Sequence, residues 1–472
     1  MCSILAIHSN RRIASSEAFA QLQRLRHRGP DGLGLVGETL ECYSTHYDEI
    51  ELAHTRAQSP WWVGSGLLSL TGSGRPPFVA VAPEERVVVA HNGEIYNYRE
   101  LARTHSIGVQ ENSSDSEFIS RLIAKLIRKE SVSRIAARLH AEVRGSYALI
   151  IHAQGKTYAF RDALGKKPIW YDETNGRVTF SSEPLHESAV LLPPSQLAIA
   201  TAGKLHLEAI PLTPVPRVPS LRRAWEESIA LRTAGKKHVA ISFSGGIDSA
   251  LIAWTAKKMG KRVTGIGVGV KGSHDALQAK KAAKAIGIPL KWKTLSEKEV
   301  KTIAQTIPGI VHTTDSLQRS VGTVNAATAA FAHRLGFRFL LSGTGADELF
   351  CGYGEFELVR GKKKEADAMR QRRVHEMWKQ NLWREDACAM RASVELRTPY
   401  LDQHVVAAAL QIPAWKNLAG TYGELRKNAL RTLAIAMGLP KEIALHPKKA
   451  MQYGSGVAKL LKPHHVVTSR HD

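Results

Sequence analysis

Short apolar runs alternate with longer amphipathic or alanine-rich stretches throughout the second half of the chain. The short runs have the length of buried strands and the longer stretches that of helices. The predicted strands cover 239–241, 262–270, 289–295 and 337–341, and the predicted helices cover 250–259, 275–287 and 323–336. Asp275 is the expected cap of the second helix, and Ser296 with Glu299 forms a capping box before a further helix. This alternation predicts a parallel, doubly wound α/β sheet that binds ligands beyond the carboxyl ends of its strands.

A glycine-rich loop connects the first of these strands to the first helix. Its residues are Ser242, Phe243, Ser244, Gly245, Gly246, Ile247, Asp248 and Ser249. Two glycines let the backbone turn tightly and point N–H groups at an anion, and the helix N-terminus adds to that attraction. No Gly-Lys-Ser/Thr follows, so the loop is not a Walker motif. A simple turn that caps the helix is the alternative, but the convergence of serines, glycines and an aspartate favours a pyrophosphate cradle.

A second glycine-rich loop follows the strand at 337–341. It reads Ser342-Gly343-Thr344-Gly345-Ala346-Asp347-Glu348. Because both loops lie at the carboxyl ends of parallel strands, Asp248 and Asp347 could face one magnesium pyrophosphate. A purely structural acidic pair is the alternative.

The first half begins with a candidate nucleophile, Cys2. Removal of Met1 makes Cys2 the amino-terminal residue, and its own α-amino group, with an ordinary pKa of about 7.7–8.0, can then serve as the base. The alternative is a small residue that only permits removal of Met1. The short runs at 4–7 and 87–91 are predicted strands.

Four further residues of the first half are candidates for holding a substrate. Arg56 ends a predicted strand and could clamp a carboxylate. Asn92-Gly93 is either a tight hairpin turn or an oxyanion hole made of an amide and a backbone N–H. Asp115 lies in Ser114-Asp115-Ser116-Glu117, which has the spacing of a capping box, and could also hold an amine.

These motifs together resemble the class II glutamine amidotransferase domain. The resemblance rests on Cys2, on RHRGPD at 26–31, on Arg56, on NGEIYN at 92–97 and on Asp115. It implies an αββα four-layer sandwich of the Ntn-hydrolase type, in which Cys2 attacks the carboxamide of glutamine. It further implies that Asn92 and Gly93 stabilise the oxyanion. Glutamine would be bound by Arg56, Asn92, Gly93, Glu94 and Asp115.

The second half resembles the PP-loop ATP-pyrophosphatase domain of asparagine synthetases. The matching segments are the loop at 242–249, GIGVGV at 265–270, SGTGADELFCGY at 342–353 and VELRTPYLD at 394–402. The resemblance implies Mg²⁺ at Asp248 and Asp347, a catalytic lysine at Lys448 or the adjacent Lys449, and ammonia passing through an internal tunnel to β-aspartyl-AMP. It implies ATP binding by Ser242, Ser244, Gly245, Gly246, Asp248, Ser249, Val268, Ser342, Gly343 and Lys427.

Thr344 departs from the pattern of that family. Many asparagine synthetases have glutamate at this position, and a β-lactam-forming branch has tyrosine. Because threonine is neither a charged acid nor a base, the acceptor carboxylate could be aspartate or another acid, such as a peptide or a small molecule. Glu348 or Glu395 could supply the missing carboxylate.

Prolines cluster between the two halves, at 193, 194, 211, 214, 216 and 219. This density is typical of an extended connection. The predicted organisation is an α+β glutaminase domain at 2–205, a linker at 206–218 and an α/β synthetase domain at 219–472.

The chain carries a formal net charge of +22, which raises the question of a nucleic-acid partner. A basic chain with an adenylating loop could be an RNA-modifying enzyme, but the cations are spread over the whole length and no RNA-binding module is evident. The four cysteines lie far apart, and no signal peptide or membrane span is recognised, so we expect a cytoplasmic enzyme. The expected partners are glutamine, aspartate and ATP, with a homodimer as a family expectation.

Overall fold

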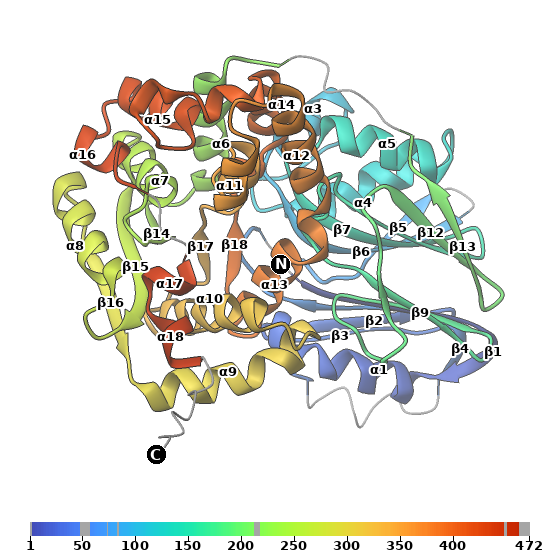
Figure 1. The fold of residues 1–472 in the computed structure, drawn as a ribbon. Coiled ribbons are helices and arrows are strands. Elements are labelled where there is room, and N and C mark those ends of the chain that lie inside the picture. Colours follow the sequence, from blue (N-terminus) through green and yellow to red (C-terminus); the bar gives the residue numbers. More distant parts are fainter. Residues whose placement is uncertain are drawn as a thin grey trace.

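The computed structural model describes residues 2–47, 57–72, 74–82, 85–211, 218–447 and 451–461. Three residues with predicted roles, Arg56, Lys448 and Lys449, lie outside the described residues, as do residues 212–217 of the predicted linker. The described chain forms an N-terminal domain of antiparallel sheets and a C-terminal domain around a parallel sheet, which lie side by side (Figure 1).

Two antiparallel sheets form the centre of the N-terminal domain. In the described residues, one sheet has the order β11 (Val190–Leu191), β9 (Trp170–Thr174), β10 (Arg177–Ser181), β1 (Cys2–Ala14), β4 (Gln58–Leu67), β2 (Leu33–Gly37) and β3 (Glu41–Ser44). The other has the order β13 (Lys204–Ala209), β12 (Gln196–Thr201), β8 (Lys156–Arg161), β7 (Gly145–Ala153), β6 (Glu85–Ile95) and β5 (Phe78–Ala82). Side chains from both sheets meet in one apolar layer that includes Ile4, Val63, Ala90 and Ile150.

Helices cover the outer faces of both sheets. Helix α1 (Ser15–Arg24) packs on the first sheet through Ala18, Phe19 and Leu22. Helices α3 (Tyr98–Thr104), α4 (Asp115–Leu126) and α5 (Val132–Glu142) pack on the second sheet. Figure 1 shows this succession of layers, with α1 below the sheets and α4 and α5 above them. The predicted αββα sandwich is confirmed.

The C-terminal domain has a parallel sheet. In the described residues its order is β16 (Leu290–Leu295), β15 (Arg262–Val270), β14 (His238–Ser242), β17 (Phe339–Leu341) and β18 (Glu395–Arg397). One face packs on α6 (Leu221–Thr233), α7 (Ile247–Lys258) and α8 (His274–Ile286). The other packs on α10 (Ser316–Arg334) and α13 (Asn381–Met390), with α9 (Glu297–Val311) beside them. The predicted doubly wound sheet is therefore confirmed.

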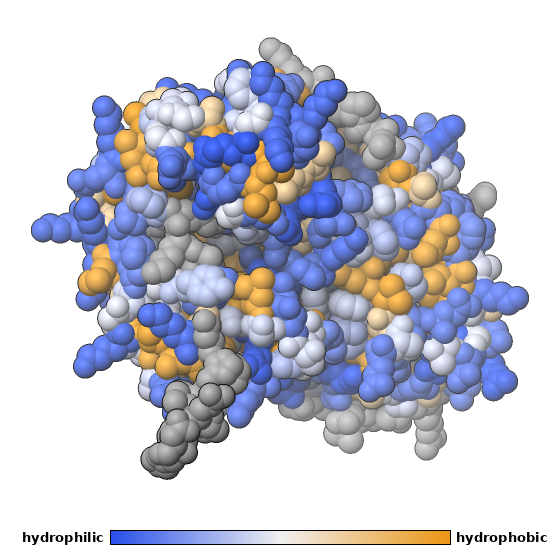
Figure 2. Space-filling model, viewed as in Figure 1, coloured by the Kyte–Doolittle hydropathy of each residue, from blue (hydrophilic) through white to orange (hydrophobic). Residues whose placement is uncertain are grey.

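Further helices complete the C-terminal domain. They are α11 (Ala346–Leu349), α12 (Lys363–Glu376), α14 (Gln403–Gln411), α15 (Asn428–Ala436), α16 (Lys441–Ala444), α17 (Met451–Gly454) and α18 (Val457–Leu461). Among the described residues, no helix combines the length and the hydropathy needed to cross a bilayer. The face in Figure 2 is largely hydrophilic, with apolar residues in small separate groups.

Two predicted helix starts and one predicted domain boundary can be compared with the observed elements. The capping box of Ser296 and Glu299 is present at the start of α9. Asp275 is not the cap of α8, because Ser273 occupies that position and the helix already begins at His274. The first domain was expected to end at residue 205, which falls inside β13, since that strand pairs with β12 up to Ala209.

Candidate active sites

Cys2 lies at the beginning of β1, next to a residue of the opposite sheet. The cysteine is buried, with 2% of its surface exposed, and its backbone nitrogen donates to Asn92 Oδ1 at 3.4 Å. Asn92 belongs to β6, so the two facing sheets bring the predicted nucleophile and the predicted oxyanion ligand together. This juxtaposition depends on packing between strands that are far apart in the chain.

Asn92 and Gly93 lie within a strand rather than in a turn. They pair with Ala148 and Tyr147 of β7, so the hairpin interpretation of Asn-Gly is wrong. A side chain at position 93 would begin 2.0 Å from the carbonyl oxygen of Ser146, which explains the glycine. The Asn92 Nδ2 group is buried without a hydrogen-bond partner in the described structure. A buried donor of this kind suits an anion that forms beside Cys2.

Asp115 lies close to the same strand. One carboxylate oxygen accepts from Ile95 N at 2.8 Å and the other from Thr71 Oγ1 at 2.9 Å. Burial raises the pKa of Asp115. Its position at the start of α4 is fixed by Ser114, whose side chain accepts from Glu117 N as the sequence predicted. A buried carboxylate near Asn92 and Gly93 suits the amine of an amino-acid substrate.

The carboxylate of Glu94 forms an ion pair with a residue of the C-terminal domain. Arg397 of the C-terminal domain donates to both carboxylate oxygens, from Nη2 at 2.5 Å and from Nε at 2.8 Å. Arg397 outweighs the effect of burial and lowers the pKa of Glu94. The prediction that Glu94 binds glutamine stays a prediction, with its carboxylate already engaged by Arg397.

The first glycine-rich loop connects β14 to α7 as predicted. Gly245 has a φ of 77°, and a side chain there would begin 2.6 Å from the carbonyl oxygen of Gln278. Only glycine suits both conditions. The amide of Gln278 in turn donates to the carbonyl oxygen of Gly245 at 3.2 Å, which holds the turn against α8.

The two glycine-rich loops meet at the carboxyl ends of β14 and β17. A side chain at Gly343 would begin 3.0 Å from Cβ of Asp248, so glycine permits this close approach. Both loops line one cavity. Of the predicted ATP ligands and metal ligands, those that line it are Ser242, Ser244, Asp248, Ser249, Ser342, Gly343 and Asp347.

Four predicted ATP ligands are not among the lining residues of this cavity: Gly245, Gly246, Val268 and Lys427. The side chain of Val268 is buried in an apolar cluster with Leu295 and Val324, which leaves its backbone at the end of β15 as the group that could reach a ligand. The predicted roles of Val268 and Lys427 in binding ATP stay predictions.

Lys427 joins the two predicted metal ligands. Its Nζ lies 2.6 Å from Asp248 Oδ1 and 2.7 Å from Asp347 Oδ1. Burial would lower the pKa of Lys427, but the two carboxylates outweigh it and raise that pKa. In the described part of the chain, no group of three or more His, Cys, Asp and Glu side chains is arranged to hold a metal ion. Two carboxylates beside a phosphate loop nevertheless fit Mg²⁺, which commonly takes one or two carboxylates together with substrate phosphates.

Several lining residues escaped the sequence analysis. They are Asp275, Asn325, Thr328, Tyr353 and Glu385, which come from α8, α10, α13 and the chain after α11. Asp275 was recognised only as a helix cap, although it follows β15 at the ligand-binding edge. Asn325 and Thr328 are spaced three residues apart on one face of α10, which is a weak signal. Nothing in the local sequence around Glu385 indicates a site.

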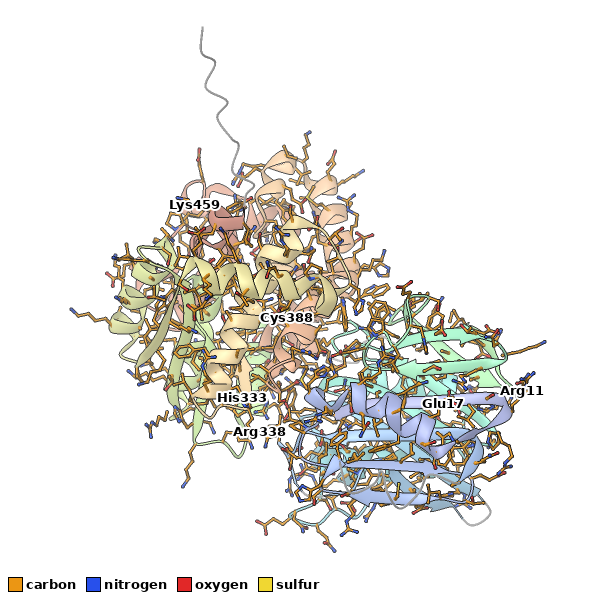
Figure 3. All side chains as sticks on the ribbon, turned by 90° about the horizontal axis from the view of Figure 1, so that it is seen from below. Arg11, Glu17, His333, Arg338, Cys388 and Lys459 are labelled. Carbon is orange, nitrogen blue, oxygen red and sulfur yellow. The ribbon has the colours of Figure 1, made fainter. Side chains whose placement is uncertain are left out.

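Buried charges also link the two domains, and sequence reasoning did not anticipate them. Arg28 Nη1 contacts Glu183 at 3.0 Å and its Nη2 contacts Asp386 at 2.5 Å. Lys167 contacts Asp386 and Glu395, each at 2.8 Å. At the edge of the interface, Arg338, labelled in Figure 3, contacts Asp31 at 2.5 Å. The RHRGPD and VELRTPYLD segments therefore serve the contact between the domains.

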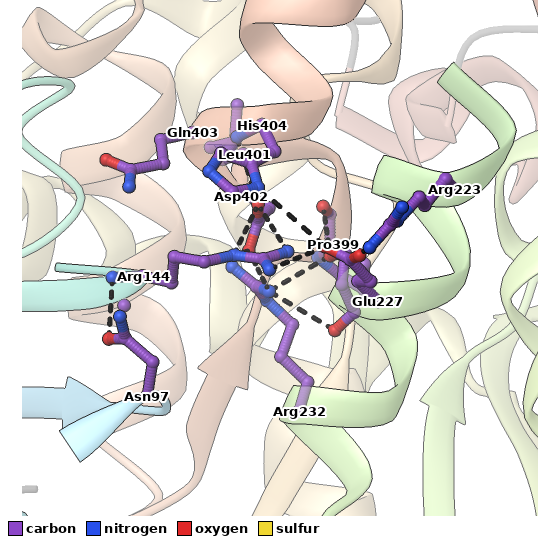
Figure 4. Close-up of polar contacts among 12 residues, drawn as sticks. Asn97, Arg144, Arg223, Glu227, Arg232, Pro399, Leu401, Asp402, Gln403 and His404 are labelled. Atoms are coloured by element: carbon purple, nitrogen blue, oxygen red, sulfur yellow. Dashed lines mark hydrogen bonds and ion pairs between the residues drawn. The ribbon is translucent and has the colours of Figure 1, made fainter. Parts of the chain in front are cut away.

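A second buried group at the interface surrounds Asp402. Arg144 of the N-terminal domain lies 3.0 Å from Asp402 Oδ1, and Arg232 of α6 lies 2.9 Å from Oδ2 (Figure 4). Glu227 binds the outer side of Arg144 at 2.8 Å. Burial alone would raise the pKa of Asp402, but the two arginines hold it below the usual value.

An apolar contact joins the two domains between Cys2 and the cavity of the C-terminal domain. Cys2 pairs with Leu67 on β4, and the following residue, Leu68, packs against Met390 of α13. Ala389, the neighbour of Met390, lines the cavity. Leu68 and Met390 are buried, with 0% and 1% of their surface exposed. This buried contact across the domain interface therefore lies one residue along the chain from Leu67 on one side and from Ala389 on the other.

An Ntn-type sandwich with an N-terminal cysteine, joined to an ATP-pyrophosphatase sheet with two phosphate loops, defines a glutamine-hydrolysing, ATP-dependent amide ligase. Comparison with protein families supports this class. The glutamine amidotransferase domain family matches residues 1–209, and the asparagine synthase family matches 220–365 and 357–466. The chain belongs to the asparagine synthase family.

Individual relatives match over nearly the whole chain. "Putative asparagine synthetase (glutamine-hydrolyzing) 1" of Methanocaldococcus jannaschii is 29% identical, over 98% of this chain and 95% of its own length. "Asparagine synthetase (glutamine-hydrolyzing) 2" of Oryza sativa subsp. japonica is 28% identical, over 98% of this chain and 79% of its own length. A solved glutamine phosphoribosylpyrophosphate amidotransferase from B. subtilis is similar with a TM-score of 0.38 and 17% identity, covering 62% of this chain and 65% of its own.

Proposed function

We propose that this protein is a glutamine-dependent asparagine synthetase. Its first reaction would hydrolyse glutamine at Cys2, and its second would convert aspartate, MgATP and the released ammonia into asparagine, AMP and pyrophosphate. The observation that supports coupling of the two reactions is the buried contact between Leu68 and Met390. It lies at the domain interface, between Cys2 and the cavity.

In the first reaction, the Cys2 thiol attacks the carboxamide carbon of glutamine. The α-amino group of Cys2, free once Met1 is removed, takes the thiol proton. The unpartnered Asn92 Nδ2 and the Gly93 N–H would stabilise the oxyanion. Asp115 would hold the substrate amine, and Arg56 its carboxylate. Ammonia leaves, and water then releases glutamate from the thioester.

In the second reaction, the two glycine-rich loops hold ATP. Ser242, Ser244, Gly245, Gly246 and Ser249 of the first loop would bind the phosphates together with Ser342 and Gly343 of the second, while Val268 and Lys427 complete the ATP site. Asp248 and Asp347 would hold Mg²⁺, which supplies positive charge to the departing pyrophosphate. Lys448, or the adjacent Lys449, would face the acyl-adenylate.

The chemistry requires this activation because a carboxylate is a poor acyl donor. Its mixed anhydride with AMP is a good acyl donor, and ammonia then displaces AMP. Delivery through the interior keeps ammonia away from bulk water, where it would be protonated and diluted.

Product analysis tests the proposal. The purified protein with aspartate, glutamine and MgATP should form asparagine, AMP and pyrophosphate in equal amounts. Omission of aspartate is the control, and it should abolish AMP formation. Absence of AMP in the complete mixture would contradict the proposal.

Thr344 favours a second candidate function. With no carboxylate at this position, the ligase could amidate another acid, such as a peptide or a small-molecule carboxylate. A panel of such acids, each tested in place of aspartate, distinguishes the two candidate functions. The true acceptor should support AMP formation at a lower acid concentration than any other acid in the panel.

A further inference from the structure

Position 344 has no carboxylate of its own, but a carboxylate from helix α13 lies next to it. Thr344 Oγ1 donates a hydrogen bond to Glu385 Oε2, which reaches the loop from α13. Thr344 Oγ1 also lies 2.7 Å from Ser342 Oγ. Because the single hydroxyl hydrogen of Thr344 is used in the hydrogen bond to Glu385, Thr344 must accept from the hydroxyl of Ser342. The two hydroxyls therefore form a hydrogen-bonded chain that ends at the Glu385 carboxylate.

The two carboxylates that the sequence offered as substitutes are engaged elsewhere. Glu395 is buried against Lys167 at 2.8 Å and does not line the cavity. Glu348 lines the cavity, but its Oε1 accepts from Tyr353 Oη at 2.6 Å and from Asn381 Nδ2 at 2.8 Å. Glu385 is therefore the carboxylate that directly contacts Thr344, the residue that departs from the family pattern.

The surroundings of Glu385 suit a proton acceptor. It lines the cavity with the phosphate loop, and 17% of its side chain is exposed there. Arg384 Nη2 lies 3.6 Å from its Oε1, and the negative charge of Glu348 also acts on it. Burial raises the pKa of Glu385, which brings a carboxylate closer to the pH range in which general bases work.

We propose that Glu385, oriented by Thr344, is the catalytic base of the amidation step. The ammonia nitrogen attacks the acyl carbon of the acyl-adenylate, and the new C–N bond replaces the bond from that carbon to the phosphate oxygen of AMP. AMP leaves with the bonding electron pair, and Glu385 takes the proton that the nitrogen loses and passes it to solvent. This inference rests on the proposed adenylation of a carboxylate at the same site.

The experiment separates adenylation from amidation. Wild type and Glu385→Gln are mixed with aspartate and MgATP, with ammonium chloride as the nitrogen source, and acid-quenched samples are assayed for acyl-adenylate, pyrophosphate and asparagine. Glu385→Gln should still form pyrophosphate and acyl-adenylate, while asparagine formation falls by about 10²–10⁴-fold. Glu376→Gln, which removes an exposed carboxylate at the end of α12, is the matched control and should behave as wild type.

Thr344 variants test the positioning role. Thr344→Val removes the hydrogen bond to the charged carboxylate, so the acid limb of the pH profile for amidation should move to higher pH. Thr344→Ser should restore it. Thermal melting of each variant verifies that it is folded, and Glu385→Asp, which keeps the charge, should retain part of the amidation rate.

The possible failures are distinguishable. If wild type releases no pyrophosphate with aspartate, asparagine synthesis is wrong, and if it also releases none with the panel of other acids, the role of Glu385 is wrong with it. If wild type reacts but Glu385→Gln forms asparagine at the wild-type rate, or loses adenylation and amidation in parallel, only the role of Glu385 is wrong. An unmoved pH profile in Thr344→Val would contradict the role of Thr344.

Discussion

Arg397 binds the carboxylate of Glu94 through two hydrogen bonds of 2.5 and 2.8 Å, and this buried pair joins the two candidate active sites. Glu94 follows Gly93 of the predicted oxyanion hole. The carbonyl oxygen of Arg397 accepts from Ser342 N, the first residue of the second phosphate loop, at 2.9 Å. One residue therefore contacts a strand of the glutaminase site and a loop of the ATP site.

Arg397→Met should destabilise the protein and uncouple its two reactions. Removal of one partner leaves Glu94 charged and buried, which costs about 3–5 kcal/mol. Urea unfolding measures the loss, and the amount of glutamate formed per asparagine should rise above one. Arg12→Met is the control, because Arg12 and Glu38 are an exposed pair worth about 0–1 kcal/mol. Equal effects of the two variants would contradict the interpretation.

Cys2→Ala should abolish the use of glutamine and leave synthesis from ammonium salts. Alanine still permits removal of Met1 but supplies no thiol, so glutaminase activity should fall by at least about 10³-fold. Cys42→Ala, which changes a buried cysteine of the same domain, should keep both activities. Parallel loss of both activities in Cys2→Ala would show that the two sites are not separable.

Asp248→Asn should have the opposite effect. The substitution weakens the contact with Lys427 and removes a carboxylate charge from the proposed Mg²⁺ site, so formation of AMP and pyrophosphate should stop while glutamine hydrolysis continues. Asp315→Asn provides a comparison, since asparagine also caps a helix well and Asp315 caps the exposed start of α10. Normal AMP formation by Asp248→Asn would rule out its assigned role.

Met390→Trp should separate the two activities without removing either catalytic centre. The larger side chain would crowd the buried contact with Leu68, which lies between the two candidate sites. Synthesis from glutamine should fall by about 10-fold or more relative to synthesis from ammonium chloride. Overpacking costs about 1–3 kcal/mol, so Leu68→Phe, from the other side of the contact, provides a second measurement. An unchanged ratio in both variants would place the ammonia path elsewhere.

Acid should weaken the contact between the domains at Asp402. Its pKa in the folded protein is held below the value of about 3.9 expected for the unfolded chain, because Arg232 and Arg144 outweigh burial. The carboxylate therefore contributes stability that is present above the unfolded pKa and is lost as the pH falls through the folded pKa. Urea midpoints across an acidic pH series should fall less steeply for Asp402→Asn than for wild type. Parallel slopes would mean that Asp402 does not contribute.

Much of the fold was predictable because local pattern and global arrangement agree. The strand at 262–270 was predicted with the bounds of β15, and the loops after β14 and β17 lie at the expected edge of the sheet. Asn92-Gly93 shows where the local signal failed. The pair is typical of a hairpin turn, yet pairing with β7 on one side and packing against Cys2 on the other hold it inside β6.

The sequence by itself determined the two kinds of domain, the candidate nucleophile and the two glycine-rich loops, because these depend on residue types at fixed short spacings. Only the tertiary structure decided how the two domains meet, since Arg28, Lys167, Glu94, Arg397 and Asp402 carry no local signal that pairs them across the chain. The same holds for Glu385. Its hydrogen bond with Thr344 forms because α13 packs next to the second loop. The two residues are 41 positions apart in the chain, so the contact depends on the packed fold and not on the neighbouring sequence.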